Sequence, residues 1–379
     1  MFRRSSHRSG LWALALSVVL VAAERAASEP AIAEARASQG IGRGSLDAGL
    51  GWEDSAASCS TPRHLLPIWR FHAGAPLPAA PTPLPDGGLG FGTDEGYVHA
   101  LGPEGEFRWS YTLDGPVTGR VAALPTTGDV VAATLTGSVY RLRGDGRGLL
   151  RFRVPSPPVT GLVAVGGRIW YGAKDDHLYA ITGHGRIVLR LAAGGALSAD
   201  PVAGGPNRVL FGTLEGGVVA VRGLHDSQRA QLDGAILDPP LPWRGGGSLV
   251  RSGRSLVALA PELGVRWRLP NVDTVGASEA VLVTSTGRDL SWHSPDGRVV
   301  RTVKLPEPLS APPLVLQRGV AVVTDAARVA VLEQTGCVAA VAALPRKGFG
   351  WLLGGGDRVV AAAGDGSIVA LELRAARAE

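Results

Sequence analysis

Short apolar runs joined by polar, glycine-bearing turns recur along the chain from Trp69 onward. Each copy consists of one β run, a turn of about four residues and a second β run. The eight equivalent turn positions are Thr93, Thr134, Ala173, Thr213, Val250, Thr284, Thr324 and Ala363. They are separated by 41, 39, 40, 37, 34, 40 and 39 residues. A period near 40 built from β runs is typical of four-stranded blades arranged radially in a β-propeller.

Each unit divides further into four strands, which we label A to D in chain order. In the first unit these are residues 77–84, 89–92, 97–101 and 107–112, with glycine-bearing turns between them. We therefore predict an all-β fold, an eight-bladed β-propeller of four-stranded antiparallel blades. Seven blades are the alternative, because the sixth unit, around Leu282, is short and weakly patterned.

The last unit runs out of chain after three strands. Residues 350–353, 358–363 and 367–373 supply strands A, B and C, and only residues 374–379 follow. The segment Leu65–Phe71, LLPIWRF, has the pattern of a D strand but no A, B or C strand before it. We expect this N-terminal strand to complete blade eight and close the ring, which removes two exposed sheet edges.

Two stretches carry a resemblance to a known family. Val98–Trp109 (VHALGPEGEFRW) and Val257–Trp267 (VALAPELGVRW) resemble the A-L-x-P-x-G-x-x-x-W turn of PQQ-like β-propeller repeats. That family includes quinoprotein dehydrogenases and BamB, a component of the outer-membrane assembly machinery, and the likeness covers residues 65–373. The residues that replace the tryptophan in other units are Leu150, Leu189, Arg229, Arg301 and Ala339.

The resemblance to quinoproteins does not extend to their cofactor site. Quinoprotein dehydrogenases of the family have adjacent cysteines, a calcium ion and a catalytic Asp, whereas Cys59 and Cys337 of this chain are 278 positions apart. The sequence also lacks H-E-x-x-H, C-x-x-C, G-x-x-x-x-G-K and G-x-S-x-G. We therefore predict no cofactor, no metal site and no catalytic residues.

Composition and charge narrow the class of partner. The 53 glycines and 27 prolines disfavour long helices, and a hydrophobic share of 45% is sufficient for a packed core. The formal charge is +5, but without Arg3, Arg4 and Arg8 the chain has 35 basic and 33 acidic residues. This near-neutral balance excludes a general electrostatic attraction to nucleic acid.

The N-terminal region differs from the repeats. Residues 1–23 combine arginines, the apolar run Leu11–Val21 and small residues, as a signal peptide does. A retained anchor is the alternative, although the apolar core of this segment holds no cysteine after a small residue, as a lipoprotein signal would. Residues 24–62 are expected to be a flexible spacer and residues 63–379 the propeller of about eight PQQ-like repeats. The protein is thus expected to be exported, periplasmic or extracellular, without a stable membrane span.

Some polar and aromatic residues allow two interpretations. Lys174, Asp175, Asp176 and His177 form the densest polar cluster, and they occupy a B–C turn where turn chemistry accounts for them. Trp243 and Trp351 lie in the innermost strands, where the side chain either packs in the core or lines the central channel.

The two cysteines are predicted to form a disulfide, because export permits one and the topology brings them together. Cys337 begins the D strand of blade seven, and Cys59 lies six residues before the D strand of blade eight. Two free thiols are the alternative.

The loops predict an interaction face. In an up-and-down blade the B–C turns and the D–A connections between blades emerge on the same side of the ring. The expected interaction residues there are Leu77, Val117, Lys174, Asp175, Ile236, Leu309, Arg346, Lys347 and Phe349. Their apolar members are expected to form an exposed ring within a charged rim. These features favour a monomeric, non-catalytic binding or scaffold protein of the bacterial cell envelope with an envelope protein partner. The alternative is an enzyme or carbohydrate-binding module acting at the mouth of the channel.

Overall fold

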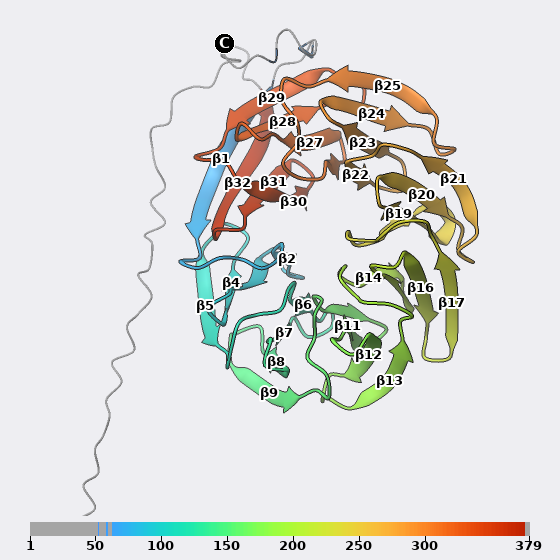
Figure 1. Ribbon diagram of the computed structural model, residues 1–379. Coiled ribbons are helices and arrows are strands. Elements are labelled where there is room, and N and C mark those ends of the chain that lie inside the picture. The colour runs from blue at the N-terminus through green and yellow to red at the C-terminus, as the bar shows by residue number, and fades with distance from the viewer. Residues whose placement is uncertain (1–51, 53–57, 60–62, 376–379) are drawn as a thin grey trace, which may run out of the picture. The chain divides into compact units, whose positions relative to one another are not determined.

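Eight four-stranded antiparallel sheets are arranged around a common centre in the computed structural model, which describes residues 52, 58–59 and 63–375 (Figure 1). The propeller is therefore eight-bladed, as predicted, and the short sixth unit forms a complete blade. The innermost strand of each blade is strand A and the outermost is strand D.

The strands follow one another around the ring in chain order. Blades one to four are formed by β2 (Thr82–Pro83), β3 (Leu89–Gly92), β4 (Tyr97–Leu101) and β5 (Phe107–Thr112); β6 (Ala122–Ala123), β7 (Val130–Ala133), β8 (Ser138–Leu142) and β9 (Gly148–Arg153); β10 (Val163–Val165), β11 (Arg168–Gly172), β12 (His177–Thr182) and β13 (Ile187–Ala192); β14 (Val202–Gly205), β15 (Arg208–Gly212), β16 (Gly217–Arg222) and β17 (Asp226–Gln231).

The second half of the ring has the same order. Blades five to eight are formed by β18 (Leu241–Trp243), β19 (Gly247–Ser252), β20 (Ser255–Leu259) and β21 (Val265–Leu269), with a 3-10 turn η1 (Arg244–Gly246) after β18; β22 (Thr274–Ala277), β23 (Leu282–Thr286), β24 (Asp289–His293) and β25 (Val299–Lys304); β26 (Leu314–Leu316), β27 (Gly319–Val323), β28 (Arg328–Leu332) and β29 (Val338–Ala343); β30 (Phe349–Gly355), β31 (Arg358–Ala363), β32 (Ser367–Ala375) and β1 (Arg63–His72).

The ring is closed by the two ends of the described chain, as the sequence predicted. Strand β1 pairs antiparallel with β32 over its whole length, from Arg63 opposite Ala375 to His72 opposite Ser367. In Figure 1 this blue strand lies among the red strands of blade eight. The pairing leaves no D strand missing from blade eight.

Aromatic side chains of the outer strands dock on glycines of the next blade. A Cβ atom on Gly105 would lie 2.4 Å from Cδ2 of Trp69, and one on Gly146 would lie 2.6 Å from Cγ of Trp109. Only glycine permits such an approach, and the positive φ of both turn residues also favours it. The Trp109 indole nitrogen donates a hydrogen bond of 2.8 Å to the carbonyl of Gly144.

The same docking in blade two uses a residue other than the one predicted. Gly185 of blade three faces the ring of Phe152, two residues after Leu150. In blade six, Arg301 and Val303 lie over Gly336. These two junctions thus keep the glycine contact without a tryptophan, although not always from the same register.

The disulfide prediction is confirmed. Cys59 and Cys337 are bonded, with their Cα atoms 5.1 Å apart. Ser58 forms a parallel bridge with Val338, and the amide of Cys59 donates a hydrogen bond of 3.0 Å to the Val338 carbonyl. The N-terminal segment is therefore attached to the outer strand of blade seven.

Trp52 belongs to the same attachment. It is 4% exposed and is part of a core cluster with residues of blades six and seven, including Trp292 and Leu305. This is the junction where Arg301 stands at the tryptophan position. The described members of the predicted spacer, residues 24–62, thus contact the propeller, while its other residues and the predicted signal peptide, residues 1–23, lie outside the described part.

Strand A of blade one is shorter than predicted. Only Thr82 and Pro83 pair with β3, whereas the sequence favoured a strand over residues 77–84. Prolines at 76, 78, 81, 83 and 85 remove the amide donors that a longer ladder would need. The described part of the chain contains no helix with the length and apolarity that crossing a bilayer requires.

Candidate functional site

The B–C turns and the D–A connections lie on the same side of the ring, which we call the loop face. Isolated β-bridges join four of the D–A connections to the B–C turn of the blade that follows. The bridged pairs are Val117 with Thr134, Pro158 with Ala173, Leu197 with Thr213, and Leu309 with Thr324. The side that bears the A–B and C–D turns is called the opposite face.

The apolar ring predicted on the loop face is not exposed. Leu77, Val117, Ile236 and Phe349 are 4%, 3%, 0% and 1% exposed, and Leu309 is half-buried. A Cβ atom on Gly92 would lie 2.4 Å from Val117, and one on Gly212 would lie 2.3 Å from Ile236. These side chains turn inward onto strand-B glycines, so the expectation that they form a contact surface was wrong. Phe349 is the first residue of β30 and not a loop residue.

The charged members of the predicted set have different surroundings. Lys174, Arg346 and Lys347 are exposed on the loop face. Arg346 forms an ion pair of 2.5 Å with Asp365. Asp175 is half-buried and bonded to its neighbours, so it stabilises its turn more than it presents a charge.

Four other apolar side chains are exposed on the loop face. Leu135 and Leu214, in the B–C turns of blades two and four, are 59% and 41% exposed. Val159 and Leu237, in the connections that lead to blades three and five, are 38% and 59% exposed. With Lys174 of blade three they form the set that we call the blade 2–5 surface.

A sequence signal for this surface exists and was missed. The B–C turns read TDEG at Thr93 and TDAA at Thr324, but TLTG at Thr134 and TLEG at Thr213. A leucine stands where other units have an aspartate. Because the repeat fixes this turn position on the surface, leucine there indicates an exposed apolar side chain.

The backbone under the blade 2–5 surface is fixed by hydrogen bonds. The amides of Leu135, Lys174 and Leu214 donate to carbonyls of the preceding connections, with distances of 3.0, 3.0 and 2.9 Å. The acceptors are the carbonyls of Pro116, Pro157 and Ala196. The exposed side chains therefore extend from rigid turns, which lowers the entropy cost of binding a partner.

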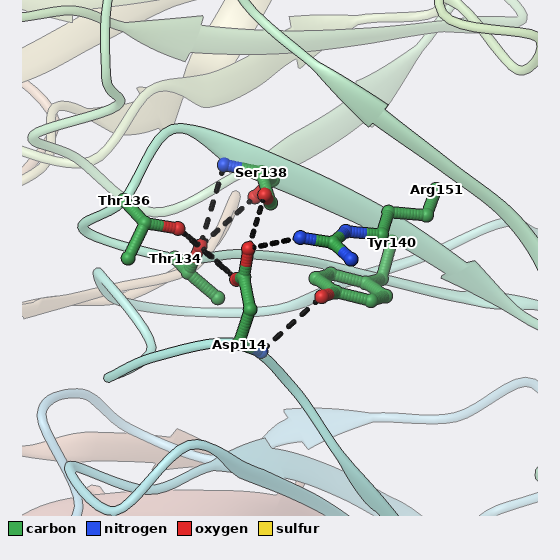
Figure 2. A network of polar contacts seen from close by, with 6 residues as sticks. All are labelled: Asp114, Thr134, Thr136, Ser138, Tyr140 and Arg151. Atoms are coloured by element: carbon green, nitrogen blue, oxygen red, sulfur yellow. Dashed lines mark hydrogen bonds and ion pairs between the residues drawn. The ribbon is translucent and has the colours of Figure 1, made fainter. Parts of the chain in front are cut away.

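Asp114 is the centre of a polar network that includes Thr134 and Thr136, the sequence neighbours of Leu135 (Figure 2). Its carboxylate accepts hydrogen bonds from Thr134 at 2.9 Å, Thr136 at 3.0 Å and Ser138 at 2.6 Å. It also pairs with Arg151 at 2.5 Å. The network joins the connection from blade one to the turn that carries Leu135.

The Asp114 carboxylate is held in its charged form. Burial opposes ionisation, but the hydrogen bonds from Ser138, Thr134, Thr136 and Arg151 outweigh burial and lower the pKa of Asp114 to about 2. Tyr140 accepts a hydrogen bond of 3.2 Å from the Asp114 amide, and the Arg151 guanidinium lies 5.4 Å from the centre of the Tyr140 ring.

Blade three repeats this arrangement with a different aspartate. Tyr179 and Arg190 occupy the positions of Tyr140 and Arg151, and both bond to Asp175, at 2.8 and 3.0 Å. Burial raises the pKa of Asp175, but the hydrogen bonds from Tyr179 and Arg190 outweigh it, so the pKa lies below its ordinary value. Asp176 has φ of 59° at the position where other turns have glycine, so this cluster has the turn role that the sequence favoured.

The residues near the central channel are relevant to the alternative function, an enzyme or carbohydrate-binding module. Trp243 is 5% exposed and Trp351 is half-buried, so packing describes both better than a channel lining. Near the inner strands, Asp200 accepts a hydrogen bond of 2.6 Å from the Gly161 amide, and its charge acts on the half-buried Arg120. Among the described residues, Cys59, Glu333 and Cys337 form a group of metal-ligand types, but both sulfurs are in the disulfide.

Comparisons with known proteins agree with the repeat pattern and the ring. Residues 67–225 match the family model described as outer membrane protein assembly factor BamB. These residues resemble the BamB family, and the described chain folds as an eight-bladed β-propeller. No curated protein sequence matches it significantly.

Solved structures with the same fold include proteins of different origins. The crystal structure of BamB from Moraxella catarrhalis is 16% identical, covers 81% of this chain and 99% of its own, and has a TM-score of 0.68. Saccharomyces cerevisiae Sqt1 is 12% identical with coverage of 82% and 99% and a TM-score of 0.67. The computationally designed Ika8 protein is 14% identical with coverage of 82% and 99% and a TM-score of 0.63. At these identities the structural likeness shows the fold alone.

Proposed function

We propose that this BamB-like propeller is a non-catalytic scaffold protein of the bacterial cell envelope that binds a protein partner on its loop face. The observation that carries the proposal is the blade 2–5 surface, with four exposed apolar side chains around Lys174. Apolar anchors beside charged groups, on a rigid backbone, are the features of protein-binding surfaces.

Two further observations support the envelope and the partner class. The matched family model is described as an outer membrane protein assembly factor. The Cys59–Cys337 disulfide is the kind of bond that persists in oxidising compartments such as the periplasm. Export, and a periplasmic or extracellular location, are therefore part of the proposal.

The test is a pull-down from envelope extract with the full chain and a matched pair of double variants. Leu135→Asp with Leu214→Asp places charges on the blade 2–5 surface, and we expect at least a tenfold loss of the recovered partner. The control is Leu149→Asp with Ile187→Asp, because these side chains are 42% and 39% exposed but lie at the other ends of the outer strands.

The control variant should recover the partner as the unchanged protein does. If the loop-face variant still recovers the partner, or if both variants lose the partner equally, the proposed surface is contradicted. Circular dichroism of both variants confirms that the propeller is intact, since all four positions are exposed.

A further inference from the structure

A second candidate site lies on the opposite face, at the junction of blades four and five. A cavity of about 450 Å³ is bordered by the A–B turns of both blades and by Pro261 of the C–D turn in blade five. Two arginines of blade four, Arg208 and Arg222, also line it. Its volume is in the range of small-molecule sites.

The two arginines face each other across adjacent strands. Arg208, the first residue of β15, pairs in register with Arg222, the last residue of β16. Like charges directly opposite in an antiparallel pair destabilise a sheet. The propeller therefore keeps a repulsive pair at this position, and the fold itself does not require it.

Arg208 and Arg222 differ in what they contact. Arg208 is 5% exposed and donates to the carbonyls of Gly246 and Pro261, at 2.5 and 2.7 Å. A guanidinium has five N–H donors, so Arg208 has further donors beyond these two bonds. Arg222 is exposed, and its side chain makes no hydrogen bond or ion pair within the described part of the chain.

Blade eight shows the same position with its charge balanced. There Arg358 stands opposite Glu372, and it donates to the Pro103 carbonyl and to Glu104 of blade one, at 3.2 and 2.9 Å. Its guanidinium also lies 3.8 Å from Glu372. Arg358 thus has two carboxylates near it.

In blade four the corresponding charges are arranged differently. Arg222 takes the place of Glu372, and Glu262 of blade five takes the place of Glu104. Burial and the charge of Arg222 lower the pKa of Arg208, while Glu262 opposes the shift. Asp226 stands opposite Arg222 on β17, so two arginines and two acidic residues lie at this junction.

An equivalent cavity at the junction of blades two and three serves as an internal comparison. It has a volume of about 430 Å³ and is lined by Arg141. Arg141 forms an ion pair of 2.6 Å with Asp129 and donates to the Gly183 carbonyl. The chain itself neutralises Arg141 there, whereas the Arg222 side chain forms no close ion pair with a described residue, although Asp226 stands opposite it on β17.

We propose that the cavity between blades four and five binds an oxyanion, a carboxylate or phosphate group, through Arg222 and the remaining donors of Arg208. Guanidinium groups match both kinds of oxyanion with paired, charge-assisted hydrogen bonds. An anion between the two arginines would also relieve their cross-strand repulsion.

Isothermal titration of the full chain with sodium phosphate and with sodium succinate, at constant ionic strength, tests the proposal. We expect one of the two probes to bind more tightly than chloride, and the probe that binds identifies the group. Arg222→Glu reverses the charge of this side chain, so it should weaken binding by at least about tenfold.

Two further variants separate the loss of the Arg222 charge from effects of other substitutions on the same face. Arg222→Gln removes the charge without adding an acid and should weaken binding in the same direction. Arg147→Gln is the matched control, since Arg147 is an exposed arginine of a C–D turn on the same face. Binding no tighter than that of chloride, unchanged binding in Arg222→Glu, or an equal loss in Arg147→Gln would each overturn the proposal.

Discussion

His99 lies in the middle of β4 and has buried ring nitrogens without a hydrogen-bond partner among the described residues. The rings of Phe91, Tyr97 and Phe107 surround it at centroid distances of 5.5, 6.0 and 6.3 Å. Burial lowers the pKa of His99 to about 4. The folded protein therefore keeps this imidazole neutral at pH values where a solvated histidine is charged.

The stability of the propeller should fall with pH because of His99. Between pH 6.5 and about 4 the unfolded chain takes up a proton at His99 that the folded chain does not bind. The loss amounts to about 3 kcal/mol once the pH has reached 4. We expect urea unfolding at pH 7 and pH 4.5 to show a smaller loss of stability in His99→Phe than in the unchanged protein.

Burial also lowers the pKa of His293. Because His293 is present in both proteins, its contribution cancels and the difference in pH dependence reports on His99. Equal pH dependence in the two proteins would show that His99 is protonated in the folded state. The exposed loop residues are not part of this effect.

The sequence pattern predicted the positions of the turns, but it did not predict which loop side chains are buried. Val117 and Ile236 follow polar turn residues and read as exposed, yet each covers a glycine in strand B of the preceding blade. The glycine and the apolar residue are about 25 positions apart, so the signal is in the pair and not in either local motif. Leu135 was detectable in principle, because the repeat aligns it with Asp94.

At the scale of elements, the N-terminal segment adds more to the ring than one strand. Strand β1 supplies the missing outer strand of blade eight, and Cys59 attaches the preceding residues to blade seven. The disulfide spans 278 positions of sequence, and cross-links that close long loops restrict the unfolded chain strongly.

Removing the disulfide should therefore destabilise the closed ring. For Cys59→Ser with Cys337→Ser we expect a decrease of about 2 to 4 kcal/mol in the free energy of unfolding. Urea unfolding of the oxidised protein and of the double variant measures the difference. The unchanged protein in reductant should unfold like the variant, and identical midpoints for all three samples would contradict a stabilising role.

The strands were predictable because each blade is built from contacts within about 40 residues of sequence. The bounds of β3, β4 and β5 coincide with those expected, and the closing strand followed from the missing fourth strand of the last unit. Trp52 was not predictable, because it lies outside the repeat and its cluster joins residues more than 200 positions away.

For the whole molecule, the fold limits the function only broadly. The same ring is found in BamB from Moraxella catarrhalis, in yeast Sqt1 and in a designed protein, all at 16% identity or less. The features that distinguish this chain are side chains placed on the ring. They are the blade 2–5 surface on the loop face and the cross-strand pair of arginines, Arg208 and Arg222, on the opposite face.

Site-specific photo-crosslinking in cells tests the central claim most directly. The photoreactive amino acid p-benzoylphenylalanine replaces Leu135, Lys174 or Leu214 on the loop face, and Leu149 or Ile187 at the other ends of the outer strands. A protein partner on the blade 2–5 surface predicts one common adduct from the three loop-face positions and none from the two controls. Adducts from the control positions alone, or no protein adduct from the loop face, would contradict the account.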